Sequence, residues 1–130
     1  MPKRVLQPAS VKAKGSYNPG WEVSNGRIIF VAGQIPWDAD GNTVCKGDVE
    51  GQTRQVFQNI EAVLAEAGGT LNDVVKITIF AADIRYRDVI NRVRTETFNE
   101  PNPASTQVAV ASLVDPEWLV EIEAIAFISN

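Results

Sequence analysis

The stretch from Val120 to Ala126, near the end of the chain, alternates apolar and polar residues up to Ala124 and then stays apolar. This period of two predicts a β-strand, because successive side chains on a strand point to opposite faces. The even-numbered residues of the stretch are all apolar and would face the core. Glu121 and Glu123 would share the other face. Two carboxylates on a strand expected to be central indicate that this face meets water, another subunit or a ligand.

Five further strands are predicted, at residues 4–7, 21–24, 27–32, 73–82 and 105–113. The step Asn25-Gly26 is typical of a tight hairpin turn, so the second and third of these strands are expected to pair with each other. The strand at 27–32 is almost continuously apolar, which favours burial on both faces.

Two segments have the period of an α-helix. The first is expected to begin after Asp48, a good N-cap, and to end at Gly68-Gly69. Its apolar stripe consists of Val56, Ile60, Val63, Leu64 and Ala67. The second is expected over about 85–98, where Pro101 and Pro103 prevent its continuation. Its inner stripe consists of Tyr86, Val89, Ile90, Val93 and Thr97.

The order of these elements predicts a single α+β domain over residues 1–130. Strand–helix–strand units need crossover connections, and the terminal strand pairs are expected to be antiparallel, so the six-stranded sheet should be mixed. Two amphipathic helices would cover one face of it. Charged and polar residues are expected on the opposite face among apolar neighbours, namely Lys76, Gln107, Glu121 and Glu123. A face of that kind is typical of a subunit interface or a ligand site.

Composition narrows the possible functions. The formal charge of −4 gives no broad attraction to nucleic acid or an anionic membrane, and no apolar run is long enough to span a bilayer. The arginines between residues 85 and 94 are interleaved with acidic residues, which favours a solvated helix face over a nucleic-acid patch. One cysteine, Cys45, is compatible with a cytoplasmic protein. Because the chain has no histidine, histidine-based catalysis and histidine metal ligands are excluded. Neither a metal nor a cofactor is predicted.

Four motifs in combination resemble the RidA family, also called YjgF/YER057c/UK114 or endoribonuclease L-PSP. They are Gly33-Gln34-Ile35-Pro36, the helix with Gln52 and Asn59-Ile60 that ends in Ala67-Gly68-Gly69, Pro103-Ala104, and Ile122-Glu123-Ala124-Ile125-Ala126. The resemblance covers nearly the whole chain. It implies a chorismate mutase-like fold and a homotrimer with clefts between subunits that take a small metabolite. Many members hydrolyse 2-imino or enamine acids to 2-oxo acids and ammonia.

The resemblance also implies roles for single residues. Glu121 corresponds to the glutamate that positions the hydrolytic water, and Tyr17 corresponds to a loop tyrosine that contacts the ligand. Gly33 would present its backbone to the ligand. Each of these residues also has a plainer interpretation. Glu121 would be a structural carboxylate paired with Lys76 or Arg27, Gly33 a simple bulge, and Tyr17 a packing residue.

The chain departs from the family pattern at two positions. Imine-hydrolysing members carry an arginine after Pro-Ala that binds the substrate carboxylate, and here that residue is Ser105. The family's asparagine on the second helix is matched to Asp88, a negative residue. Gln107 is predicted as a further ligand contact. Because of the two departures, the expected substrate is an imine or enamine other than the usual small 2-imino acids. A trimer that binds a metabolite without turnover is the alternative, and a ribonuclease is the weakest possibility.

Overall fold

The computed structural model describes residues 2–130, and its elements follow the predicted order. The strands are β1 (Lys3–Leu6), β2 (Gly20–Val23), β3 (Gly26–Gln34), β4 (Val74–Ala81), β5 (Ala104–Ala109) and β6 (Val120–Ser129). The helices are α1 (Val49–Glu66) and α2 (Arg87–Thr97), and two single 3₁₀ turns, η1 (Leu71–Asp73) and η2 (Ile84–Tyr86), precede β4 and α2. Strand β5 is shorter than predicted because its partner β4 ends at Ala81.

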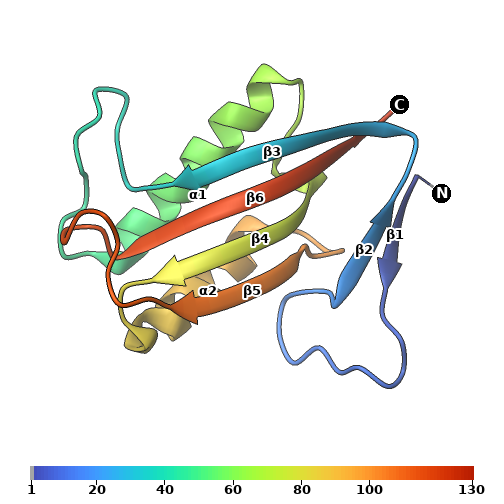
Figure 1. Ribbon diagram of the computed structural model, residues 1–130, viewed down its shortest axis with the longest axis horizontal. Coiled ribbons are helices and arrows are strands. Elements are labelled where there is room, and N and C mark those ends of the chain that lie inside the picture. The colour runs from blue at the N-terminus through green and yellow to red at the C-terminus, as the bar shows by residue number, and fades with distance from the viewer. Residues whose placement is uncertain (1) are drawn as a thin grey trace.

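The strands form two sheets, so the prediction of one six-stranded sheet is wrong. Four strands pair in the order β3-β6-β4-β5, and β1 pairs with β2 in a separate two-stranded sheet. The larger sheet is mixed, as predicted, because β4 and β5 are parallel whereas β6 is antiparallel to both of its neighbours. Both helices lie behind this sheet in the view of Figure 1. The α+β class, with two helices on one face, is confirmed.

The predicted hairpin between β2 and β3 does not form. Strand β2 pairs with β1, and β3 pairs with β6. Asn25 does adopt the left-handed conformation of a turn, with a φ of 59°. However, this turn carries the chain from one sheet to the other. Gly26 is required there by packing, because a Cβ atom on it would come within 2.9 Å of the Phe127 ring.

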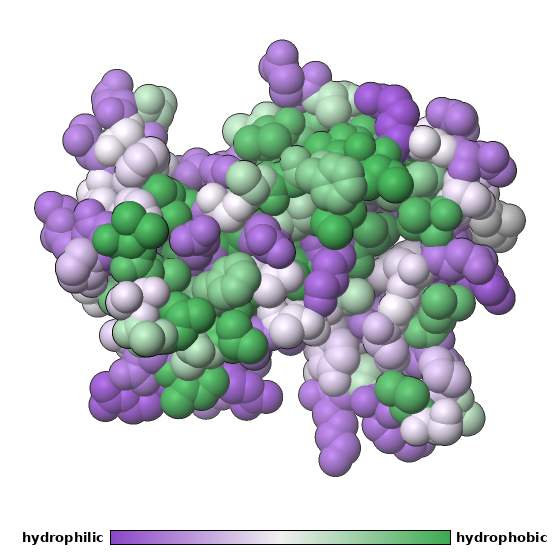
Figure 2. All heavy atoms as spheres, in the orientation of Figure 1, coloured by the Kyte–Doolittle hydropathy of each residue, from purple (hydrophilic) through white to green (hydrophobic). Residues whose placement is uncertain are grey.

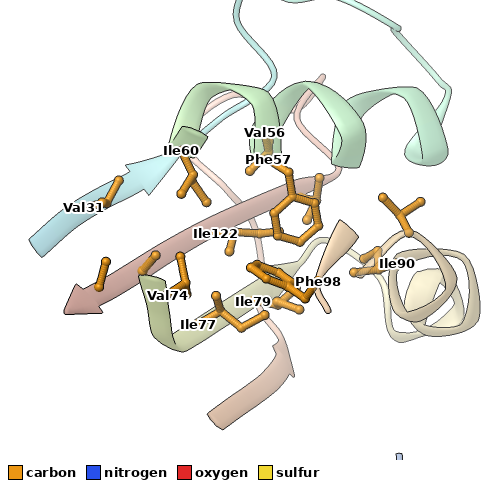
Figure 3. Packing of buried hydrophobic residues seen from close by; sticks show 14 of the residues in the cluster. Val31, Val56, Phe57, Ile60, Val74, Ile77, Ile79, Ile90, Phe98 and Ile122 are labelled. Atoms are coloured by element: carbon orange, nitrogen blue, oxygen red, sulfur yellow. The ribbon is translucent and has the colours of Figure 1, made fainter. Parts of the chain in front are cut away.

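The core lies between the four-stranded sheet and the helices (Figure 3). Helix α1 begins where predicted, with the Asp48 carboxylate accepting a hydrogen bond from the Gly51 amide at 3.1 Å. The rings of Phe57 and Phe98 meet edge to face, with centroids 5.3 Å apart. Val63 was expected in the core but is 40% exposed. Half of the residues of the two helical stripes are buried as predicted, namely Val56, Ile60, Leu64, Ile90 and Val93, and four others are half-buried.

Strand β6 occupies a central position between β3 and β4, as predicted from its pattern. Its apolar residues Val120, Ile122, Ala124 and Ala126 are all buried against the helices. The opposite face of the four-stranded sheet, which we call the open face, carries Glu121 and Glu123.

Burial of β3 on both faces is not observed in the single chain. Val31 is buried, but Ile28 is 52% exposed and Phe30 is 74% exposed on the open face. Figure 2 shows the apolar side chains gathered there. The described part of the chain contains no helix whose length and apolar character would let it cross a membrane.

Candidate functional site

A cavity of about 370 Å³ lies at the edge of the four-stranded sheet, between β5, α2 and the loop before β2. Asn18 fixes this loop to the start of β5, because its side-chain amide donates to the Asn102 carbonyl at 2.7 Å and its backbone amide donates to the Pro103 carbonyl at 3.1 Å. The lining residues are Lys14, Gly15, Ser16, Tyr17, Arg87, Asn91, Arg94, Thr95, Ser105 and Gln107. We call this cavity the edge pocket.

Three residues predicted to contact a ligand, Tyr17, Ser105 and Gln107, line the edge pocket together. Gln107 was expected on the same sheet face as Glu121, and this is wrong. In the register of β4 and β5, Ser105 lies beside Ile77 and Gln107 beside Ile79, and both isoleucines face the helical core. The two polar side chains therefore point to the helix side.

Arg94 is the principal residue that the sequence pattern did not identify. It was expected on a solvated helix face, but it is 7% exposed. Its Nη1 atom donates to the Ser105 hydroxyl at 3.1 Å. Burial lowers the pKa of the Arg94 guanidinium, and the nearby positive charge of Arg87 lowers it further, while Tyr17 acts in the opposite direction.

The sequence did contain a signal for Arg94. It follows Ile90 by four residues and Tyr86 by eight, so it falls on the same helical stripe as these inner residues. An arginine on an apolar stripe at the edge of a sheet is placed to reach over the edge strand. Asn91, which also lines the edge pocket, follows Ile90 directly and was likewise not predicted.

Asp88 is not brought into the edge pocket. Its side chain is 96% exposed, and its nearest charged partner is Arg87, at 3.8 Å. The contribution of α2 to the pocket begins instead with Arg87 and continues one turn later with Asn91 and Arg94. The negative charge matched to the family's asparagine therefore points into solvent in the single chain.

Glu121 and Gly33 form a second cluster, on the open face. A Cβ atom at Gly33 would lie within 2.9 Å of the Glu121 Cδ atom and closer still to Oε2. The absence of a side chain at Gly33 therefore creates the space that the carboxylate occupies. Partial burial raises the pKa of Glu121 above its usual value, and the negative charge of Glu123 raises it further.

The loop that follows Gly33 at the end of β3 is held in place by α1. The Asn59 side-chain amide donates to the carbonyls of Ile35 and Trp37, each at 3.0 Å. The helix asparagine and the glycine-proline loop, recognised separately in the sequence, thus belong to one structural unit. Within one chain, the Glu121–Gly33 cluster and the edge pocket lie on opposite faces of the sheet.

A mixed sheet backed by two helices, with a glycine loop seated on a partly buried carboxylate, defines a small α+β protein of the type seen in Rid structures. The solved structure of YyfB from Yersinia pestis, described as a Rid-family protein of unknown function, has a TM-score of 0.86 to this chain. The two are 30% identical, and the match covers 98% of this chain and 100% of that one.

Sequence comparisons agree with this structural likeness. The family described as Endoribonuclease L-PSP matches residues 7–128. A RutC family protein of Pyrococcus abyssi is 44% identical over 123 residues, which cover 95% of this chain and 94% of that protein. The 3-aminoacrylate deaminase RutC of Acinetobacter baylyi is 36% identical over 129 residues, covering 98% and 100%. The chain belongs to the RidA (YjgF/YER057c/UK114) family.

Proposed function

We propose that the protein hydrolyses the carbon–nitrogen bond of an imine or enamine metabolite, releasing ammonia. The observation that carries this proposal is the Glu121 carboxylate, which is partly buried against Gly33 and has a raised pKa. A carboxylate whose pKa is moved toward neutrality is a better general base than an exposed one. The similarity to a relative named as a 3-aminoacrylate deaminase supports the same class of reaction.

In this proposal Glu121 accepts a proton from a water molecule as the water oxygen attacks the imine carbon. The imine nitrogen takes up a proton, which gives a tetrahedral carbinolamine. Transfer of the carbinolamine hydroxyl proton to nitrogen, through Glu121, allows the C–N bond to break, and ammonia leaves as the carbonyl forms. The net reaction consumes one water molecule and needs neither an oxidant nor a cofactor. An enamine enters the same sequence after protonation at carbon converts it to the imine.

We further propose that the active protein is a homotrimer with its metabolite in a cleft between subunits. Two observations support this assembly. Ile28 and Phe30 expose apolar surface on the open face, which burial in an interface would remove from water. The edge pocket and the Glu121–Gly33 cluster lie on opposite faces of one sheet, so contact between subunits offers a way for both to reach one ligand.

Ser105 supports a substrate other than the usual small 2-imino acids. A single hydroxyl cannot form the paired hydrogen bonds that an arginine at that strand position would form with a carboxylate. The alternative function is a trimer that binds a small metabolite without turnover, in which Glu121 would only contact the ligand.

The test is ammonia release from a panel of imines and enamines that extends beyond the small 2-imino acids formed by an amino-acid oxidase. Glu121→Ala should reduce turnover by about 10²–10⁴-fold, the usual effect of losing a general base. Glu66→Ala is the control, because it removes an exposed carboxylate at the end of α1, away from the Glu121–Gly33 cluster, and should retain turnover. If calorimetry shows that ligands bind while no imine in a broad panel is hydrolysed, the proposed enzymatic function is overturned. That result would favour the trimer that binds a metabolite without turnover.

A further inference from the structure

Three buried polar atoms that lack a hydrogen-bond partner all belong to residues of the edge pocket. They are Asn91 Oδ1, Arg94 Nε and Gln107 Nε2, and residues 2–130 contain no other buried side-chain atom of this kind. Native proteins satisfy nearly all of their buried polar groups. The concentration of all three in one cavity indicates that a ligand supplies the missing partners.

The charge of the edge pocket indicates what kind of ligand this is. Arg94 is almost fully buried and forms no ion pair with the residues that the structure describes. Burying an unpaired charge is costly, so such a guanidinium favours an anion beside it. Lys14 and Arg87 also line the pocket, and none of its lining residues is acidic. A chain with a formal charge of −4 therefore contains a locally positive cavity.

The guanidinium has one edge whose Nε atom is buried without a hydrogen-bond partner. Nη1 donates to the Ser105 hydroxyl, whereas Nε has no partner. Nη2 lies on the side of Gly15, where a Cβ atom would be 3.8 Å away. Nε and Nη2 form one straight edge of the planar group, and that edge matches the two oxygens of a carboxylate. Gln107 Nε2 is a second unpartnered donor in the same pocket, whereas Asn91 Oδ1 is an acceptor that needs a donor elsewhere on the ligand.

We propose that Arg94 binds the carboxylate of the metabolite through its Nε–Nη2 edge, and that Ser105 positions the guanidinium for this contact. This inference rests on the proposed function only in taking the edge pocket as part of the same ligand site. Arg94 is a specificity-determining residue in this scheme, and Ser105 is a positioning residue. The carboxylate is thus bound by a residue of α2 instead of a residue of β5.

The test measures binding, so that it does not depend on turnover. The probes are 2-oxopentanoate and its neutral analogue 2-oxopentanamide, titrated by calorimetry into the oligomer. Arg94→Met removes the charge but keeps a long side chain. A charge-assisted hydrogen bond is worth about 1.5–3 kcal/mol, so 2-oxopentanoate should bind about 10- to 150-fold more weakly. Binding of the amide should change by less than about threefold, and Arg94→Lys should be intermediate for the acid.

Two further variants separate this role from a structural one. Arg85→Met is the matched control, because it removes the same charge from an arginine that is 84% exposed, and it should bind both probes normally. Ser105→Ala keeps the charge and removes only the hydroxyl that accepts from Arg94. It should weaken 2-oxopentanoate binding by about three- to tenfold, with no change in oligomer mass by light scattering.

Several results would overturn the proposal. Equal losses for the acid and the amide in Arg94→Met would show a structural role. Dissociation of the oligomer in that variant would show that Arg94 pairs with a second copy of the chain. Tighter binding of inorganic phosphate than of 2-oxopentanoate would reject a carboxylate as the preferred anion. Because the readout is binding, loss of acid binding in Arg94→Met would still support the inference if no imine were hydrolysed and the enzyme proposal failed.

Discussion

Gly33→Ala tests whether the close approach of Gly33 to Glu121 fixes the position of the carboxylate. The backbone of Gly33 lies outside the left-handed region, so an alanine adds no backbone strain there. Its methyl carbon would nevertheless lie within 2.9 Å of Glu121 Cδ and 3.1 Å of Cγ, too close for the present side-chain position. Glu121 must therefore move. The contact involves the end of a flexible side chain, so the fold should be retained.

The expected effect on stability follows from two opposing contributions. Pushing Glu121 off its preferred rotamer costs about 0.5–1.5 kcal/mol. Replacing glycine by alanine at a compatible backbone position stabilises the protein by about 0.4–1 kcal/mol through the unfolded chain. The single variant should thus be near neutral or slightly destabilised. In a Glu121→Ala background the clash is absent, and Gly33→Ala should be stabilising. The effect of Gly33→Ala on the free energy of unfolding should differ between the two backgrounds by about 0.5–1.5 kcal/mol, and this difference measures the contact between residue 33 and Glu121.

Urea unfolding of the four proteins of this cycle provides the measurement, and Gly20→Ala is the control. A Cβ atom at Gly20 meets Leu6 at an ordinary 3.6 Å, so its effect should be the same in both backgrounds. Turnover of the best substrate in the imine and enamine panel should fall in Gly33→Ala toward the level of Glu121→Ala. Identical stability changes in the two backgrounds, or full turnover in the single variant, would refute the reasoning.

Two further predictions concern the open face. The raised pKa of Glu121 means that the folded protein holds this proton more tightly than the unfolded chain, whose glutamate has an ordinary pKa near 4.5. Stability is therefore lost as the pH rises from that value through the raised pKa. Glu121→Gln should remove this loss and should match the stability of the wild type at lower pH, as measured by urea titrations. A pH dependence of stability equal to that of the wild type would contradict it. Phe30→Lys should convert the proposed trimer to a monomer by light scattering, because a charge would replace a ring that is 74% exposed in the single chain. The control is Val114→Lys, which alters an exposed loop residue away from the sheet, and a trimer in both variants would reject an interface on this face.

Features that depend only on residues close together in the sequence could be predicted without the structure. The two-residue period of β6 separates its buried apolar side from Glu121 and Glu123, and this holds wherever the strand is placed. The N-cap of α1 at Asp48 and the order of the elements are local in the same sense. The family motifs also follow from short stretches of sequence, so the family was recognisable without coordinates.

Pairing between distant strands was decided only by the tertiary structure. The Asn25-Gly26 turn is real, but a turn signal does not specify which strand lies beside the next one. The burial of β3 was misjudged because a long apolar run does not tell an internal core from a surface that another chain would cover. In β5, the period shows that Gln107 and Val108 face opposite sides. It does not show which side holds the helices, and Gln107 proved to face α2.

The edge pocket depends on contacts that no local pattern contains. The side chain of Arg94 is buried because α2 crosses the edge strand where Ser105 offers a small polar partner. In the sequence, Ser105 indicates only that the arginine of the family pattern is absent from this position. In the folded chain, the guanidinium of Arg94 lies beside Ser105, although the two residues are 11 apart in sequence. The sequence determined which residue types were available for binding. Their distances and burial arise from packing between elements, and the structure therefore decided which of them share a pocket.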